Sequence, residues 1–172
     1  MNGMTNELEK LIEFHKRLQQ EQLEYFIEQL PTISGIYDRM MMGDTPILDT
    51  TEKVGKYAIT LFYSKMAEEL YLISLSSSKR LISYDQISRG DPNSAPAPIR
   101  LIMETVISSN AHSVVLAHNH PSGELEPSIN DIDVTTKVAN ALKTIDVKLH
   151  DHIIVSRKKY VSMKKIGIIW GL

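Results

Sequence analysis

The 172-residue chain contains no cysteine. Disulfide bonds are therefore excluded, and so is every metal site that uses thiolate ligands. A zinc ion bound by this chain would have to take its ligands from histidine nitrogens and carboxylate oxygens. The same absence excludes a zinc deaminase, because that class needs a Pro-Cys-x-x-Cys element.

The sequence also lacks a long apolar stretch and a strong net charge of either sign. No segment approaches the length needed to span a bilayer, and residues 1–14 lack the apolar core of a signal peptide. The formal net charge of −2 gives no general attraction to nucleic acid or to an anionic membrane. With 42% hydrophobic and 23% charged residues, we expect a soluble globular protein in the cytoplasm, without membrane contact.

The pattern of apolar and turn-forming residues divides the chain near residue 48. Residues 1–48 predict a short helical N-terminal segment that ends in a Gly/Pro cluster. Residues 49–172 alternate strand-like and helix-like stretches, which predicts an α/β sandwich around a mixed sheet. We expect helices over about 50–66, 99–110 and 128–144, strands over 70–75, 80–88, 113–117, 147–156 and 160–163, and an extended loop over 90–98.

The strand expected at 113–117 runs directly into His118-Asn119-His120. Residues two apart at a strand end point to the same side, with Cα atoms roughly 6–7 Å apart, so both imidazoles could meet one ion. Asp131, in the first turn of the next helix, could supply a third ligand and leave one position open. The alternative is structural, because Ser128 and Asp131 also fit a helix capping box, and a strand-end His-x-His alone is weak support for a metal site.

The complete spacing resembles that of a known family. His118-x-His120-Pro121 followed by Ser128-x-x-Asp131, with ten residues between His120 and Asp131, is similar to the signature of the JAMM (MPN-plus) metalloproteases. The longer string over 118–123, together with residues 149–155, resembles the RadC branch of that superfamily, over about residues 48–167.

This resemblance implies the JAB/MPN fold, a cytidine-deaminase-like α-β-α sandwich. It also implies a zinc ion held by His118, His120 and Asp131, with water as the fourth ligand. Ser128 would polarise the scissile carbonyl and stabilise the oxyanion. Asp151 and His152 also match the RadC-like pattern, as residues that line the site or serve the structure.

The general base of the family is a glutamate at the start of the first strand. Glu68 and Glu69 both stand there, and counting back from Leu75 places Glu68 at the family position. Because side chains alternate along a strand, only one of the two can face the metal. We therefore predict that Glu68 is the base and that Glu69 is the alternative.

These features predict a zinc-dependent hydrolase that cleaves a peptide or isopeptide bond in a protein substrate. One alternative is a metal-binding module that acts on or near DNA, since RadC-like proteins carry a DNA-repair label by tradition. A basic patch (Arg157, Lys158, Lys159, Lys164 and Lys165) favours it, although a solvated turn explains the patch equally well, and no helix-hairpin-helix motif is evident in residues 1–48. The other alternative is a non-catalytic scaffold. The sequence indicates neither the substrate nor the oligomeric state.

Overall fold

The computed structural model describes residues 45–63, 65–90 and 98–169. These residues belong to one compact unit, Asp44–Leu172. The helical segment predicted for residues 1–48 and the loop predicted for 90–98 lie almost entirely outside the described residues. Within the described ranges, no helix is long and apolar enough to cross a membrane.

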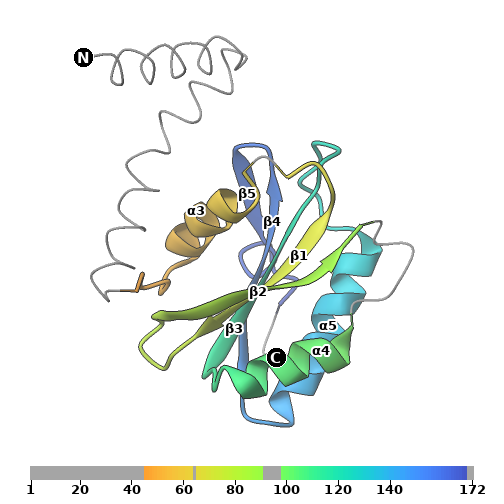
Figure 1. The fold of residues 1–172 in the computed structure, drawn as a ribbon. Coiled ribbons are helices and arrows are strands. Elements are labelled where there is room, and N and C mark those ends of the chain that lie inside the picture. Colours follow the sequence, from red (N-terminus) through yellow and green to blue (C-terminus); the bar gives the residue numbers. More distant parts are fainter. Residues whose placement is uncertain (1–44, 64, 91–97, 170–172) are drawn as a thin grey trace, which may run out of the picture. The chain divides into compact units, whose positions relative to one another are not determined.

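Five strands form one mixed sheet in the order β2-β1-β3-β4-β5 (Figure 1). β1 (Glu69–Leu75) pairs antiparallel with both β2 (Leu81–Arg89) and β3 (Ser113–Asn119). β3 pairs parallel with β4 (Lys148–Ser156), which pairs antiparallel with β5 (Lys159–Ser162). A parallel pair needs a long crossover, and the chain between β3 and β4 supplies it as a helix. The predicted α/β fold with a mixed sheet is confirmed.

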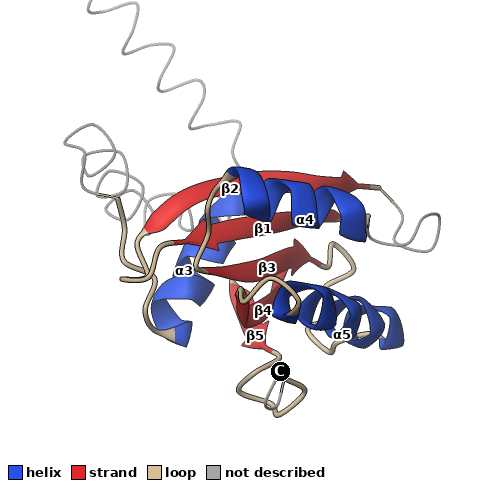
Figure 2. Ribbon diagram, turned by 90° about the horizontal axis from the view of Figure 1, so that it is seen from below, coloured by secondary structure: helices blue, strands red, loops and turns tan. Residues whose placement is uncertain are grey.

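Three helices of the described chain complete the layers. α3 (Thr51–Leu61) packs against β4 and β5, whereas α4 (Ile99–Ser108) and α5 (Ile129–Lys143) pack against each other (Figure 2). The two central strands, β1 and β3, are buried along their whole length. A strand that is buried throughout must be covered on both faces, which is the α-β-α arrangement expected from the sequence.

The faces of the central strands follow from the alternation of their side chains. Leu72 of β1 and Leu116 of β3 belong to the hydrophobic core that includes Ile102 of α4 and Val138 of α5. Successive side chains point to opposite faces, so the even-numbered residues of both strands face the α4–α5 pair and the odd-numbered residues face away from it. His118 therefore lies on the α5 side of the sheet.

The start of α3 agrees with the sequence, but its end does not. Thr50 is the N-cap, and its hydroxyl accepts a hydrogen bond from the Lys53 amide at 3.2 Å. The predicted end near residue 66 is wrong, because the helix stops at Leu61. Phe62 instead packs edge-on against Tyr71, with ring centroids 5.5 Å apart. No glycine or proline marks this end, so apolar periodicity alone extended the helix too far.

One edge of the sheet gathers segments that are far apart in the sequence. β3 and β4 end there, and β1 begins there, because β1 runs antiparallel to β3. Two hydrogen bonds join the ends of β3 and β4: the His120 amide donates to the Val155 carbonyl at 2.8 Å, and the Ser156 hydroxyl donates to the His120 carbonyl at 2.9 Å. The first turn of α5 (Ile129–Lys143) also lies at this edge, because its Asp131 carboxylate contacts both His118 and His120.

Candidate metal centre

The two histidines of the motif face each other at the end of β3. Their Nε2 atoms lie 2.7 Å apart, and their ring centroids are separated by 4.6 Å. His118 is buried, whereas the side chain of His120 keeps 12% of its surface exposed. The prediction that both imidazoles point to the same side of the strand end is confirmed.

The Nδ1 atom of each ring already has a hydrogen-bond partner. His120 Nδ1 lies 3.2 Å from the carbonyl oxygen of Glu124. A carbonyl only accepts, so this hydrogen bond requires the proton on Nδ1 and leaves the Nε2 lone pair bare in the neutral ring. His118 Nδ1 lies 2.8 Å from Nε2 of His152. With the His118 proton also on Nδ1, two Nε2 lone pairs meet, and a shared cation would relieve their repulsion.

A buried polar chain continues from His118 to α5. His152 Nδ1 lies 2.6 Å from the hydroxyl oxygen of Thr135, which donates to the Asp131 carbonyl at 2.5 Å. Burial holds the pKa of His152 well below its ordinary value, so this ring is neutral. One arrangement of protons satisfies the whole chain: His118 donates to His152, and His152 donates to Thr135. His152 therefore supports the site from behind.

Asp131 brings a carboxylate to the two imidazoles. Its Oδ1 lies 3.2 Å from His118 Nε2, and its Oδ2 lies 3.5 Å from His120 Nε2. Burial by itself would raise the pKa of Asp131, but the hydrogen bonds with His118 and His120 outweigh it and hold that pKa far below its ordinary value. The hydrogen bond with Asp131 in turn raises the pKa of His120. The cluster thus favours a positive charge at its centre, whether a proton or a metal ion.

The same aspartate also caps its own helix. The Asp131 amide donates to Ser128 Oγ at 3.1 Å, and the Ser128 amide donates to Asp131 Oδ2 at 2.7 Å. The Ser128 hydroxyl donates to that Oδ2 as well, at 2.7 Å. The capping box considered in the sequence is therefore present, and it leaves Oδ1 directed at His118. The structural and the metal-facing interpretations of Asp131 are compatible.

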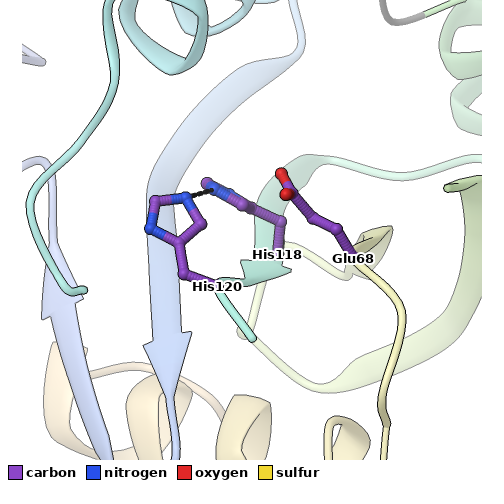
Figure 3. Close-up of side chains that lie close together, drawn as sticks. All are labelled: Glu68, His118 and His120. Atoms are coloured by element: carbon purple, nitrogen blue, oxygen red, sulfur yellow. Dashed lines mark hydrogen bonds between the residues drawn. The ribbon is translucent and has the colours of Figure 1, made fainter. Parts of the chain in front are cut away.

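Glu68 approaches the imidazoles from the start of β1. One carboxylate oxygen of Glu68 and one nitrogen each of His118 and His120 all lie within 4.8 Å of one another, and Figure 3 shows the Glu68 side chain directed toward the His118 ring. Glu69, the alternative, is buried with its carboxylate next to Lys65 Nζ at 3.2 Å and Arg89 Nε at 3.4 Å. Of the two glutamates, Glu68 is the one that joins the histidines in a cluster that could hold a metal ion.

Asp151 has no part in this cluster, although it precedes His152 directly. Its carboxylate accepts from the Ser162 hydroxyl at 2.6 Å, the His152 amide at 2.8 Å and the Lys164 amide at 3.2 Å. These donors fasten β4 to β5 and to the turn that follows β5. Asp151 is therefore structural, and His152 is the member of the pair that reaches the histidine cluster.

The sequence argument missed the contacts of two residues of this region. Thr135 links His152 to α5, and its position four residues after Asp131, on the same helix face, could have identified it. Asn119 lies between the two histidines and bonds to the backbone on both sides of Glu68. Nothing in the local sequence predicts that contact, because it joins residues about 50 positions apart.

The basic turn between β4 and β5 lies beside the histidine loop. The Arg157 guanidinium packs against Gly123, where an added Cβ would stand 3.6 Å from an Nη atom. Gly123 has a φ of +103°, which favours glycine at this position. Positive charge therefore lies close to the loop that follows His120.

Comparison with known proteins agrees with this architecture. Residues 48–168 match the family model described as a RadC-like JAB domain. The chain belongs to the RadC-like JAB family. A UPF0758 protein of Methylibium petroleiphilum is 33% identical over 128 residues, which cover 74% of this chain and 58% of that protein. A UPF0758 protein of Fusobacterium nucleatum is 35% identical over 147 residues, which cover 82% of this chain and 62% of that protein. This RadC-like chain thus spans about three fifths of the length of these two relatives.

Proposed function

We propose that this RadC-like domain is a zinc-dependent hydrolase that cleaves a peptide or isopeptide bond. The observation that carries the proposal is the convergence of two imidazole Nε2 atoms and two carboxylates at one edge of the sheet. Structural polar clusters pair donors with acceptors, whereas this one, when both imidazoles are neutral and protonated on Nδ1, gathers acceptors around a common centre. A divalent cation and an attacking water would complete it.

The donor set fits zinc. Around a tetrahedral zinc with bonds of about 2.0–2.2 Å, ligand atoms lie about 3.3–3.6 Å apart. The separations of 3.2 and 3.5 Å from Asp131 to the imidazoles lie close to that range, and the 2.7 Å between the two imidazole nitrogens would have to widen to admit the ion. Two imidazoles and one carboxylate also suit zinc better than magnesium or calcium. When bound, zinc would act as a Lewis acid and lower the pKa of water at the site toward about 7.

Glu68 would serve as the general base. Its carboxylate would accept a proton from the attacking water and return it to the amine that leaves. A separation of up to 4.8 Å from the imidazole nitrogens leaves room for one water molecule between them. Glu68 would thus act on the water, whereas Asp131 would hold the ion.

His152 and Thr135 would fix the orientation of His118. With His152 neutral, its Nε2 accepts the proton that His118 carries on Nδ1, which keeps His118 Nε2 available as a ligand. Thr135 completes the chain and ties it to the helix that carries Asp131. Ligand geometry would therefore depend on residues that never touch the ion.

Ser128 would stabilise the negative charge that develops on the scissile carbonyl oxygen. Its hydroxyl donates to Asp131 Oδ2 at 2.7 Å, so it would have to turn from that oxygen toward the substrate. The cap would survive the turn through the Ser128 amide, which donates to the same carboxylate. Replacement of Ser128 by alanine should then lower kcat about 10²–10³-fold, the usual effect of losing one oxyanion donor.

A cleavage assay tests the proposal. Peptides and isopeptide-linked protein conjugates would be incubated with the zinc-loaded protein, with a chelator, and with Glu68→Gln. Cleavage should require zinc and should disappear in Glu68→Gln, while Glu104→Gln should remain active. Glu104 is a suitable control because it is exposed on α4 and pairs with Arg100 at 2.8 Å. Cleavage that is unaffected by both the chelator and Glu68→Gln would contradict the proposal.

A second candidate is a metal site that acts on DNA. The observation that favours it is the position of Arg157 beside the histidine loop, where it could contact a phosphate. The same assay should include single- and double-stranded DNA. If DNA is cut, and both a chelator and Glu68→Gln abolish the cutting, then the substrate is DNA instead of a peptide and the metal site stands. Tight DNA binding that resists both the chelator and Glu68→Gln would instead favour a binding module.

A further inference from the structure

We propose that Asn119 is a positioning residue for Glu68, an inference that rests on the proposed role of Glu68 as base. Asn119 is 5% exposed and ends β3 between the two histidines. Because side chains alternate along the strand, Asn119 points away from the face that His118 occupies. It cannot be a ligand with the histidines, so its buried carboxamide needs another explanation.

The carboxamide of Asn119 spans the backbone around Glu68. Its Oδ1 accepts from the Glu69 amide at 2.8 Å, and its Nδ2 donates to the Ala67 carbonyl at 2.9 Å. An amide N–H needs an oxygen partner and a carbonyl needs a donor, so these two bonds also fix which way the carboxamide is turned. The side chain of Asn119 therefore binds the peptide group on each side of Glu68.

These bonds replace strand pairing where the ladder ends. The register of β1 and β3 stops at the pair Leu70 and His118. Beyond this pair, the Asn119 side chain takes the place of a partner backbone. It bonds to the backbone of Glu69 and of Ala67, which precedes β1. On the opposite side, the Gly90 amide donates to the Glu68 carbonyl at 2.9 Å. The backbone at Glu68 is therefore fixed from both sides.

This anchoring has a direct consequence for the site. Asn119 sits between His118 and His120 in the chain, so one short stretch of β3 would place the metal ligands and the base together. The Glu68 carboxylate lies with the imidazoles (Figure 3), while the backbone at Glu68 is held by the residue between the two histidines. Misplacement of a reacting group by about 1 Å can cost on the order of 100-fold in rate. Loss of the carboxamide should therefore impair proton transfer without removing the ion.

The test compares Asn119→Ala, which loses both bonds, with Asn119→Asp, which keeps the acceptor and loses the donor. The control is Ser113→Ala at the other end of β3, where a buried hydroxyl accepts from Lys79 Nζ at 2.8 Å. Zinc content, kcat and KM on a peptide that the native protein cleaves, and amide hydrogen exchange at Glu69 would be measured. We expect Asn119→Ala to lower kcat on the order of tenfold or more, with zinc content and KM kept.

Amide exchange and a double variant separate positioning from general destabilisation. The Glu69 amide should lose its protection in Asn119→Ala but keep it in Asn119→Asp and Ser113→Ala. Asn119→Ala combined with Glu68→Gln should be no slower than Glu68→Gln alone, because a misplaced base and an absent base are equivalent. Multiplying effects in the double variant, or equal loss of kcat in Ser113→Ala, would overturn the proposal.

A probe that needs no substrate covers the case in which no peptide is cleaved. The visible absorption of the cobalt(II)-loaded protein would be followed as a function of pH, since the charge of Glu68 influences the ionisation of nearby water. Asn119→Ala should shift the midpoint in the same direction as Glu68→Gln. No shift in Glu68→Gln would refute the role of Glu68 itself. A shift in Glu68→Gln without one in Asn119→Ala would refute the positioning role alone.

Discussion

Two buried carboxylates, Asp131 and Asp151, show how the proposed ligand site differs from a structural one. Asp151 is surrounded by donors, namely two hydroxyls and two backbone amides, which satisfy its carboxylate. Asp131 also accepts from its helix cap, but its carboxylate faces two imidazole nitrogens whose lone pairs are directed inward. Both carboxylates are buried and accept hydrogen bonds. They differ in whether the donors around the carboxylate balance the acceptors.

The largest expected effect concerns the two glutamates at the start of β1. Glu68→Gln should keep the zinc and lower kcat about 10²–10⁴-fold, the usual contribution of a general base. Glu69→Gln should keep most of the activity, because Glu69 pairs with Lys65 and Arg89 instead of the imidazoles. Steady-state kinetics and elemental analysis of both variants would decide. Loss of turnover in Glu69→Gln alone would show that the register of β1 is misassigned.

Replacement of each buried aspartate tests the comparison directly. Asp131→Ala should lose zinc affinity, because a ligand is removed. Asp151→Ala should retain zinc but lower the free energy of unfolding by about 2–3 kcal/mol, because buried donors lose a charged acceptor. Zinc titration and denaturant unfolding would be measured on both. Equal effects of the two variants on zinc affinity would show that the site has no special role for Asp131.

A smaller effect on zinc affinity is expected for His152 and Thr135, the hydrogen-bonded chain that begins at His118. His152→Leu should lower zinc affinity about 10–100-fold, the usual result of removing a hydrogen-bond partner of a ligand. Thr135→Val should act in the same direction and more weakly, since it lies one step further from His118. Competition with a chelating dye would give both affinities. Unchanged affinity in His152→Leu would mean that the buried chain serves packing alone.

The smallest effect is a dependence of zinc affinity on pH. The pKa of His120 is raised by Asp131 in the metal-free protein, so a proton occupies Nε2 up to a higher pH than in an ordinary histidine. Zinc must displace that proton, and its affinity should fall as the pH is lowered through the raised value. Asp131 keeps its charge throughout, since its own pKa is far below the ordinary value. Affinity that does not change between pH 8 and about pH 6, near the ordinary histidine pKa, would contradict this account.

The sequence predicted the parts of the site that depend on local spacing. The placement of His118 and His120 follows from strand periodicity, and the capping box at Ser128 follows from residue types three positions apart. Alternation implied only that one of Glu68 and Glu69 faces the site, and the choice of Glu68 came from the family resemblance. Strands and helices were placed within a few residues, except at the end of α3, where Phe62 packs on Tyr71 and no breaker residue marks the change.

The remainder required the fold. The contact of His152 with His118 depends on β4 pairing parallel with β3, with its register shifted between Val114 and Val115. The bonds of Asn119 to the peptide groups around Glu68 depend on where the β1–β3 ladder stops. Spacing within one segment carries no information on either point. The resemblance named His152 as a residue that lines the site or serves the structure, but its contact with His118 and the bonds of Asn119 could not be derived from the sequence.

The most direct test of the account is the zinc stoichiometry of the purified protein. Elemental analysis of protein prepared without added metal should give about one zinc per chain for the native sequence, and no zinc after His118→Ala and His120→Ala together. The double variant should remain folded, which circular dichroism would confirm. Full zinc occupancy in the folded double variant would contradict the site, and so would native protein that neither contains zinc nor binds it on titration.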